Sequence, residues 1–146
     1  MKKRGMLLIV GILAAVVVLV GAVRIALNAE NKIFSMVEER RVVYEQAARQ
    51  LLEDGEVREV EDIESMYVFV GKHNMVEFMI DEDGVIPPAQ YYGFYYSPDD
   101  VPLAFQNVDV TLNEYKENEW EWSEENDNHG ITKKITECWY YFEAWL

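Results

Sequence analysis

Cysteine and histidine are scarce in this sequence, and their scarcity argues against several kinds of site. The single cysteine, Cys138, cannot form an intramolecular disulfide, and we expect it to be a small buried residue of a strand. The two histidines, His73 and His129, stand beside asparagine and glycine, where exposed loop residues are expected. No P-loop, G-x-S-x-G or H-E-x-x-H motif occurs. We therefore predict no catalytic residues, no metal ligands and no cofactor, and hence no enzyme.

Basic residues are few beyond the first 27 positions. The chain has 13 Lys and Arg and 27 Asp and Glu, and four of the basic residues but none of the acidic ones precede Asn28. The remainder therefore carries nine bases and 27 acids, a net charge of −18. Such a surface repels phosphates and anionic headgroups, so we predict no nucleic-acid partner and expect any charged partner to be cationic.

Charge is entirely absent from residues 6–23, MLLIVGILAAVVVLVGAV. As a helix rising about 1.5 Å per residue this run extends roughly 27 Å, and with residues 24–27 it crosses a hydrocarbon core of about 30 Å. The run is apolar on every side, whereas a helix of a soluble protein usually shows a polar stripe. We therefore predict that residues 6–27 form a transmembrane helix in the lipid bilayer.

A basic tail precedes the apolar run and predicts its orientation. Lys2, Lys3 and Arg4 lie within residues 1–5, and such a tail, typical of exported bacterial proteins, stays in the cytoplasm. A cleaved signal peptide is the alternative, but its apolar region usually has only about 7–15 residues. We predict an uncleaved signal anchor of a single-pass cell-membrane protein, with the C-terminal domain outside.

An amphipathic helix is predicted after the membrane segment. Residues 28–34 begin with polar residues and are predicted to be a linker. Ser35 and Glu38 have the spacing of a capping box, in which each side chain bonds to a free backbone amide of the first turn. Gly55 is a typical helix stop. The predicted helix therefore runs from Ser35 to Asp54, with an apolar stripe formed by Val37, Tyr44, Ala48 and Leu51.

The rest of the chain has the pattern of an antiparallel sheet. Apolar runs separated by turn signals predict strands at 66–70, 76–80, 91–96 and 119–122 and a hairpin over 131–146. Residues 108–112 fit a strand or a loop. Val76, Phe78 and Ile80 alternate with Glu77, which predicts a sheet with one buried face. The predicted fold class is α+β, with residues 35–146 forming one domain in which the helix packs on about five to seven strands.

Aromatic residues are the most suggestive candidates for a binding site. Large rings stack on sugars and anchor protein partners, so a flat, partly exposed face would be a candidate ligand site. The alternative is that the same rings fill the layer beneath the helix. The candidate ligand-binding residues are Trp120, Trp122, Trp139, Tyr141 and Trp145.

The tether, the acidic surface and the missing catalytic set favour one function. We expect a membrane-tethered, extracytoplasmic, non-enzymatic module that binds a protein partner of the cell envelope. One alternative is binding of cell-wall glycans through the aromatic face. A second is weak sensing of divalent cations or polycations, with carboxylates in residues 81–83 and 124–128. An EF-hand loop is excluded, because with Gly130 in its sixth place Thr136 would stand where a bidentate glutamate is needed.

Overall fold

A computed structural model of the protein describes residues 29–83 and 90–146. The chain divides into two compact units, Met1–Lys32 and Ile33–Leu146, and residues 29–32 are the described part of the first. The basic tail (1–5) and the predicted transmembrane segment (6–27) lie outside the described residues. Within the two described ranges, no helix is long and apolar enough to cross a membrane.

The described chain begins with an α-helix over residues 29–54. Residues 29–34 of the predicted linker (28–34) are helical, so the predicted helix start at Ser35 was wrong. The reason is that Ile33, which is buried, lies one turn before Val37 and extends the apolar stripe. The predicted end is confirmed, because Gly55 adopts a φ of 74° and donates its N–H to the Leu51 carbonyl at 3.0 Å.

In the described residues, seven strands form one antiparallel sheet, in the order β1-β2-β3-β7-β6-β5-β4. Each strand pairs antiparallel with its neighbours, and the meander β1–β3 joins the meander β4–β7 through β3 and β7. The predicted α+β class, a helix packed on an antiparallel sheet, is confirmed. The bounds are β1 (Ser65–Phe69), β2 (Met75–Asp83), β3 (Gln90–Tyr96), β4 (Asn113–Lys116), β5 (Glu119–Ser123), β6 (His129–Thr136) and β7 (Trp139–Trp145).

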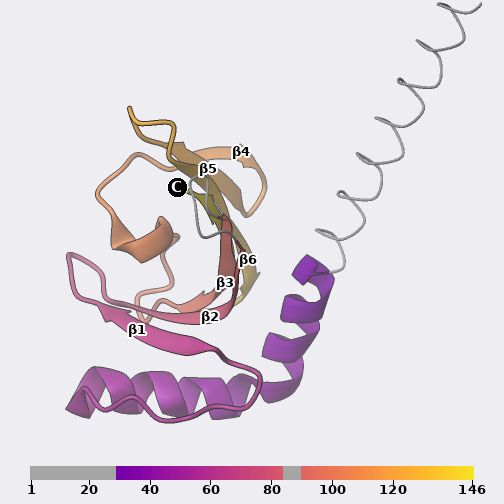
Figure 1. Ribbon diagram of the computed structural model, residues 1–146, viewed down its shortest axis with the longest axis vertical. Coiled ribbons are helices and arrows are strands. Elements are labelled where there is room, and N and C mark those ends of the chain that lie inside the picture. The colour runs from indigo at the N-terminus through magenta and orange to yellow at the C-terminus, as the bar shows by residue number, and fades with distance from the viewer. Residues whose placement is uncertain (1–28, 84–89) are drawn as a thin grey trace, which may run out of the picture. The chain divides into compact units, whose positions relative to one another are not determined.

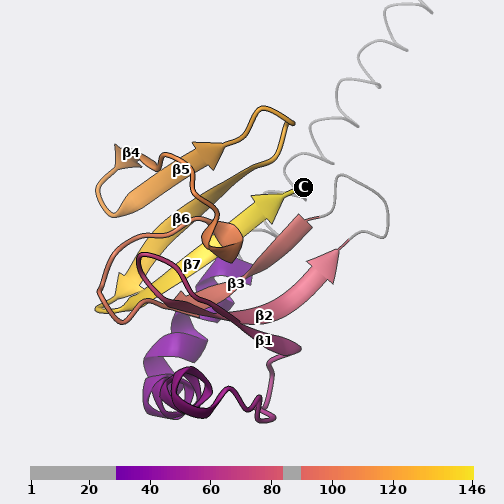
Figure 2. The same ribbon diagram turned by 90° about the vertical axis from the view of Figure 1, so that its left-hand side faces the viewer.

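The helix covers one face of the sheet with an aromatic core. Figures 1 and 2 show the helix beneath β1 and β2, on the outer side of the curved sheet. The ring of Tyr44 lies 5.6 Å from Phe78 and 4.9 Å from Phe94, and the last two rings stack at 4.8 Å. Trp139 from β7 closes this cluster at 5.8 Å from Phe94. Large rings fill the space between helix and sheet, as the layer packing requires.

The opposite face is covered by the connection between β3 and β4, residues 97–112, which we call the strap. A 3-10 turn, η1 (Phe105–Asn107), lies on the inner side of the sheet in Figures 1 and 2. Phe105 stacks on Tyr91 at 5.3 Å and contacts Phe142 at 5.2 Å. The prediction of one buried face was therefore wrong for the central strands, because the strap buries the second face.

The structure decides one open alternative at the strap and corrects one prediction at the last hairpin. Residues 108–112, which fit a strand or a loop, are a loop, and Val108, Val110 and Leu112 pack from it against the second core. Cys138 does not lie in a strand: it occupies the turn between β6 and β7 with a φ of 66° and is only partly buried. The predicted hairpin over 131–146 is formed by β6 and β7, and β7 alternates between the two faces, with Trp139 on the helix side and Tyr140 on the strap side.

Three hydrogen-bonded anchors hold the strap on the sheet. At its start, Asp100 accepts hydrogen bonds from the Cys138 amide at 2.8 Å and the Tyr140 hydroxyl at 3.0 Å, and it pairs with Lys134 at 2.6 Å. In the middle, the Leu103 amide donates to the Tyr95 hydroxyl at 2.8 Å. In η1, the Gln106 amide donates to the Glu77 carboxyl group of β2, and the Asn107 side-chain amide donates to the His73 carbonyl in the turn after β1. The strap is therefore a fixed layer of the domain.

Candidate binding surface

The five aromatic residues predicted as a ligand face do not lie on one surface. Trp139 and Tyr141 are buried beneath the helix, which was the alternative interpretation. Trp122 is buried and Trp120 partly buried on the strap side of the sheet. Trp145, at the end of β7, stacks on the His129 ring at 5.0 Å. Strand alternation divides these rings between two faces, and Trp122, Trp139 and Tyr141 are buried there.

The carboxylates proposed for cation sensing form no recognisable metal centre in the described part. In the β5–β6 turn, Glu124 and Asn128 bond to each other, with the Asn128 side-chain amide donating to the Glu124 carboxylate at 3.0 Å. The side chains of residues 81–83 lie outside the described ones. Among described residues, no group of three or more His, Cys, Asp or Glu side chains is placed to hold a metal ion.

Exposed apolar side chains gather on β1, at one end of the sheet. Tyr67 is 49% exposed and Val70, directly after the strand, is 79% exposed. Val68, between them, is also exposed. Isolated exposed apolar residues are common on protein surfaces, but three within four positions of one strand end are a patch. We call Tyr67, Val68 and Val70 the edge patch.

The edge patch lies on a strand whose outer side has no partner in the described chain. β1 is the last strand of the sheet and pairs only with β2. An edge strand presents a row of backbone N–H and C=O groups to which another chain can add. Proteins usually protect such edges with lysine, proline or a bulge. β1, with the sequence SMYVF, contains none of these.

The opposite edge of the sheet is protected in the usual way. β4, with the sequence NEYK, is exposed at all four positions and has a register irregularity between Glu114 and Lys116. Lys116 forms an ion pair with Glu119 of β5, and the Tyr115 hydroxyl donates to the same carboxylate at 2.9 Å. Of the two edges of the described sheet, only β1 is therefore apolar and unprotected.

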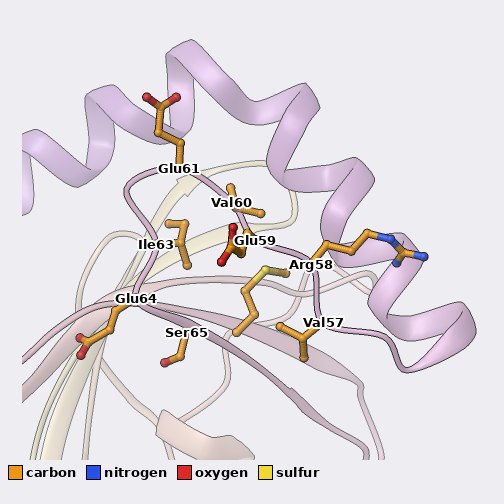
Figure 3. Close-up of a pocket in the computed structure, with 9 residues that line it drawn as sticks. Val57, Arg58, Glu59, Val60, Glu61, Ile63, Glu64 and Ser65 are labelled. Carbon is orange, nitrogen blue, oxygen red and sulfur yellow. The ribbon is translucent and has the colours of Figure 1, made fainter.

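A pocket lies beside the start of β1. It has a volume of about 510 Å³ and is lined by residues 57–61 and 63–66, from the segment that arches between the helix and β1 in Figure 3. Ile63 and Val57 lie inside this arch, whereas Glu61 and Arg58 point outward. The apolar part of the lining comes from Val57, Val60, Ile63 and Met66, and carboxylates come from Glu59, Glu61 and Glu64.

The carboxylates around this pocket are only partly neutralised. Arg40 of the helix contacts Glu61 and Asp62, each at 3.4 Å. Glu59 and Glu64 form no ion pair among the residues that the structure describes. The rim of the pocket thus carries negative charge available to a cationic group from outside.

A buried carboxyl group fixes the strap opposite β1. Glu77 of β2, paired with Tyr67 in the sheet register, is fully buried. Its Oε1 accepts a hydrogen bond from the Gln106 amide at 2.7 Å, which supports η1 where Gln106 and Asn107 have φ values of 54° and 55°. Burial raises the pKa of Glu77 to about 8, despite the hydrogen bond from Gln106, so the group is largely protonated at neutral pH.

A second contact ties η1 to the turn after β1. The Asn107 side-chain amide donates to the His73 carbonyl at 2.9 Å, and the His73 ring lies 2.8 Å from Asp99 of the strap. His73 was predicted to be an exposed turn residue, and it is partly exposed in the β1–β2 turn. The turn that follows the edge patch is therefore held in place by the strap.

Sequence reasoning predicted the strand but not the surface. A strand over 66–70 was expected, yet the edge patch was not singled out, because strand order decides which strand is an edge. One signal was present: residues 66–70 are all apolar, so either both faces are covered or part of the strand is exposed. Glu77 was expected on a solvated face because it alternates with the apolar Val76 and Phe78, but the strap covers that face and Glu77 is buried.

Comparisons with known proteins identify no relative for this chain. No family model, no curated protein sequence and no solved structure matches it significantly.

Proposed function

We propose that this protein is a non-enzymatic binding module, tethered to the membrane by residues 6–27, whose folded domain lies outside the cytoplasm and binds a protein partner of the cell envelope. The observation that carries the proposal is the unprotected edge of β1 with its exposed Tyr67 and Val70. Strand edges of this kind are used for protein recognition by strand addition.

The sequence supports the tether and the side of the membrane. Residues 6–23 are uncharged and long enough to span a bilayer with residues 24–27, and the basic residues at positions 2–4 favour a cytoplasmic N-terminus. A domain held at the membrane surface meets its partners at a raised effective concentration, so a modest binding surface is sufficient. The edge patch and its pocket have the character of such a surface.

Protease added to intact cells tests the location. An immunoblot against the C-terminus should show that the domain is degraded from outside, while a cytoplasmic control protein stays intact. Full protection of the domain until the cells are lysed would contradict the proposed orientation. Recovery of the complete chain in the soluble fraction without detergent would contradict the tether.

Affinity purification tests the binding. The full chain, expressed at its native level and solubilised in mild detergent, should retain at least one envelope protein in stoichiometric amount. Recovery of the chain alone, after chemical crosslinking in intact cells as well as without it, would contradict the proposed function. A detergent-solubilised membrane protein of unrelated sequence serves as the control for nonspecific retention.

A further inference from the structure

We propose that the free edge of β1 binds an extended segment of a partner protein in which apolar residues alternate with lysine or arginine, and that this segment adds to the sheet as an eighth strand. The inference rests on the proposed function and deepens it, because it specifies the chemistry of the partner. It starts from the edge patch and from the carboxylates beside it.

Strand addition first requires a strand edge without a partner, and β1 has one such edge. Within the described chain, β1 pairs with β2 over Ser65–Phe69 and with no other strand. An added strand would pair with the groups that point away from β2, and these main-chain hydrogen bonds give affinity independent of the partner's sequence. The strand is fixed in place beneath, since Met66 is buried against the helix and Phe69 packs on the strap side.

The two kinds of partner side chain pack on different faces of the added strand. Tyr67 and Val68 lie on opposite faces of β1, so the apolar residues of the partner lie beside Tyr67 and the aliphatic stems of its basic residues lie along Val68. On the face of Val68, at the start of β1, the pocket of about 510 Å³ offers the apolar groups of Ile63 and Met66 to these stems. Pockets for alternate side chains give strand addition its specificity.

The negative charge beside β1 indicates basic residues at the alternate positions of the partner segment. Glu59 and Glu64 border the pocket without a basic partner among the described residues, and the chain after residue 27 has a net charge of −18. Lysine or arginine at alternate positions of the added strand would approach these carboxylates. A second copy of this chain fits less well, because it would bring the same excess of acid to the interface.

The test uses the full chain in detergent micelles and a dye-labelled octapeptide of alternating lysine and valine as the probe. Binding is followed by fluorescence anisotropy. Tyr67→Lys should weaken binding at least about tenfold. Tyr115→Lys is the matched control, because Tyr115 lies on the opposite edge strand, is equally exposed at 49%, and receives the same change of charge; it should weaken binding less than about twofold.

Two further measurements separate strand addition from simple charge attraction. An octapeptide of alternating lysine and proline has the same charge, but its prolines lack N–H donors and fix φ near about −65°, away from the values of a β-strand, so it should bind at least about tenfold more weakly. Val70→Lys, at a site that is 79% exposed and outside the strand, should weaken the lysine–valine peptide without affecting the fold. Circular dichroism and thermal unfolding verify that each variant is folded.

Several outcomes would overturn the inference. Equal weakening by Tyr67→Lys and Tyr115→Lys, or equal binding of the lysine–proline peptide, would show nonspecific attraction to an acidic surface. No binding of the lysine–valine peptide, or a dimer in light scattering that Tyr67→Lys abolishes, would also contradict it. If affinity purification nevertheless recovers an envelope partner, the proposed function stands and only this mode of binding fails.

Discussion

The two ends of the sheet differ in how well they are covered and in the chemistry of their edge strands, and the better covered end has the less protected edge. The β4–β5 end is thinly covered, and its edge carries lysine, glutamate and an irregular register. The β1–β2 end lies between the helix and the strap, yet its edge is apolar and unprotected. The more solvated β4 edge is thus the one protected against pairing with another strand. The β1 edge is unprotected, but the helix and the strap hold its strand in place, as a binding surface requires.

The largest expected effect tests the rigid support. Phe78→Ala removes a fully buried ring that contacts Tyr44, Phe94 and Trp139, and it should lower the free energy of unfolding by about 3–5 kcal/mol. Trp120→Ala, at the β5 end, removes a partly buried ring and should cost clearly less. Urea unfolding followed by tryptophan fluorescence and by circular dichroism measures both; equal losses would remove the contrast between the two ends.

The next effect comes from the buried carboxyl group of Glu77 in β2, beside β1; among the described residues, β5, the strand beside β4, has no buried carboxyl group. The folded-state pKa of Glu77, about 8, lies above its ordinary value of 4.5, so the folded domain holds a proton that the unfolded chain releases. This contribution to stability is complete below pH about 4.5 and is lost as the pH rises through about 8.

Melting temperatures measured from pH 5 to 9 test this prediction. We expect the melting temperature of the native chain to fall by several degrees over this range, and that of Glu77→Gln to fall less, because the amide cannot ionise. Glu121→Gln, at a solvent-exposed position of β5, is the control and should follow the native chain. Parallel curves for Glu77→Gln and the native chain would contradict the burial of this group.

A smaller effect is expected at the first anchor of the strap. Burial raises the pKa of Asp100, but the hydrogen bonds from Lys134, Cys138 and Tyr140 outweigh it and hold the pKa below its usual value. Asp100→Ala should therefore lower the free energy of unfolding by about 1–3 kcal/mol at pH 7. In the native chain this contribution is present above the ordinary pKa of 3.8 and is lost in acid.

Chemical denaturation at pH 7 and pH 3 checks the anchor. The difference between Asp100→Ala and the native chain should shrink at the lower pH, because protonation removes the charge from the native carboxylate. Asp99→Ala is the neighbouring control, since the Asp99 carboxylate is more exposed and contacts only the His73 ring among the bonds described. A difference that is constant with pH would contradict the role of the Asp100 charge.

The smallest effect on stability is expected at the edges themselves. Tyr67→Lys and Tyr115→Lys should each change the free energy of unfolding by less than about 1 kcal/mol, because both rings are half exposed. Replacing Glu114 and Lys116 of β4 by valine should instead make the second edge apolar and cause concentration-dependent association, detectable by light scattering. A monomer at all concentrations would show that edge chemistry does not control pairing in this sheet.

Local sequence patterns predicted the elements better than their arrangement. The helix end at Gly55, the strands at 66–70, 76–80 and 91–96 and the last hairpin followed from capping, turn signals and apolar runs. The helix start was misplaced because a capping-box spacing at Ser35 was preferred to the apolar Ile33. Tertiary packing decided the outcome, since burial of Ile33 outweighs the capping signal.

The candidate site was less predictable, because it depends on contacts distant in sequence. Trp122 and Trp139 lie on different faces, since one packs on the strap and the other under the helix. The apolar residues of the strap, from Val101 to Leu112, fit a strand as well as a loop, so the second covered face could not be foreseen. The exposure of Tyr67 follows from strand order, which local periodicity does not contain.

Amide hydrogen exchange of the full chain, followed by mass spectrometry with and without the lysine–valine octapeptide, tests the central claim most directly. Strand addition predicts slower exchange in fragments covering residues 64–70 and unchanged exchange in fragments covering Asn113–Lys116. Slower exchange at β4, or no change at β1 while the peptide is bound, would contradict the claim that the β1 edge receives the partner.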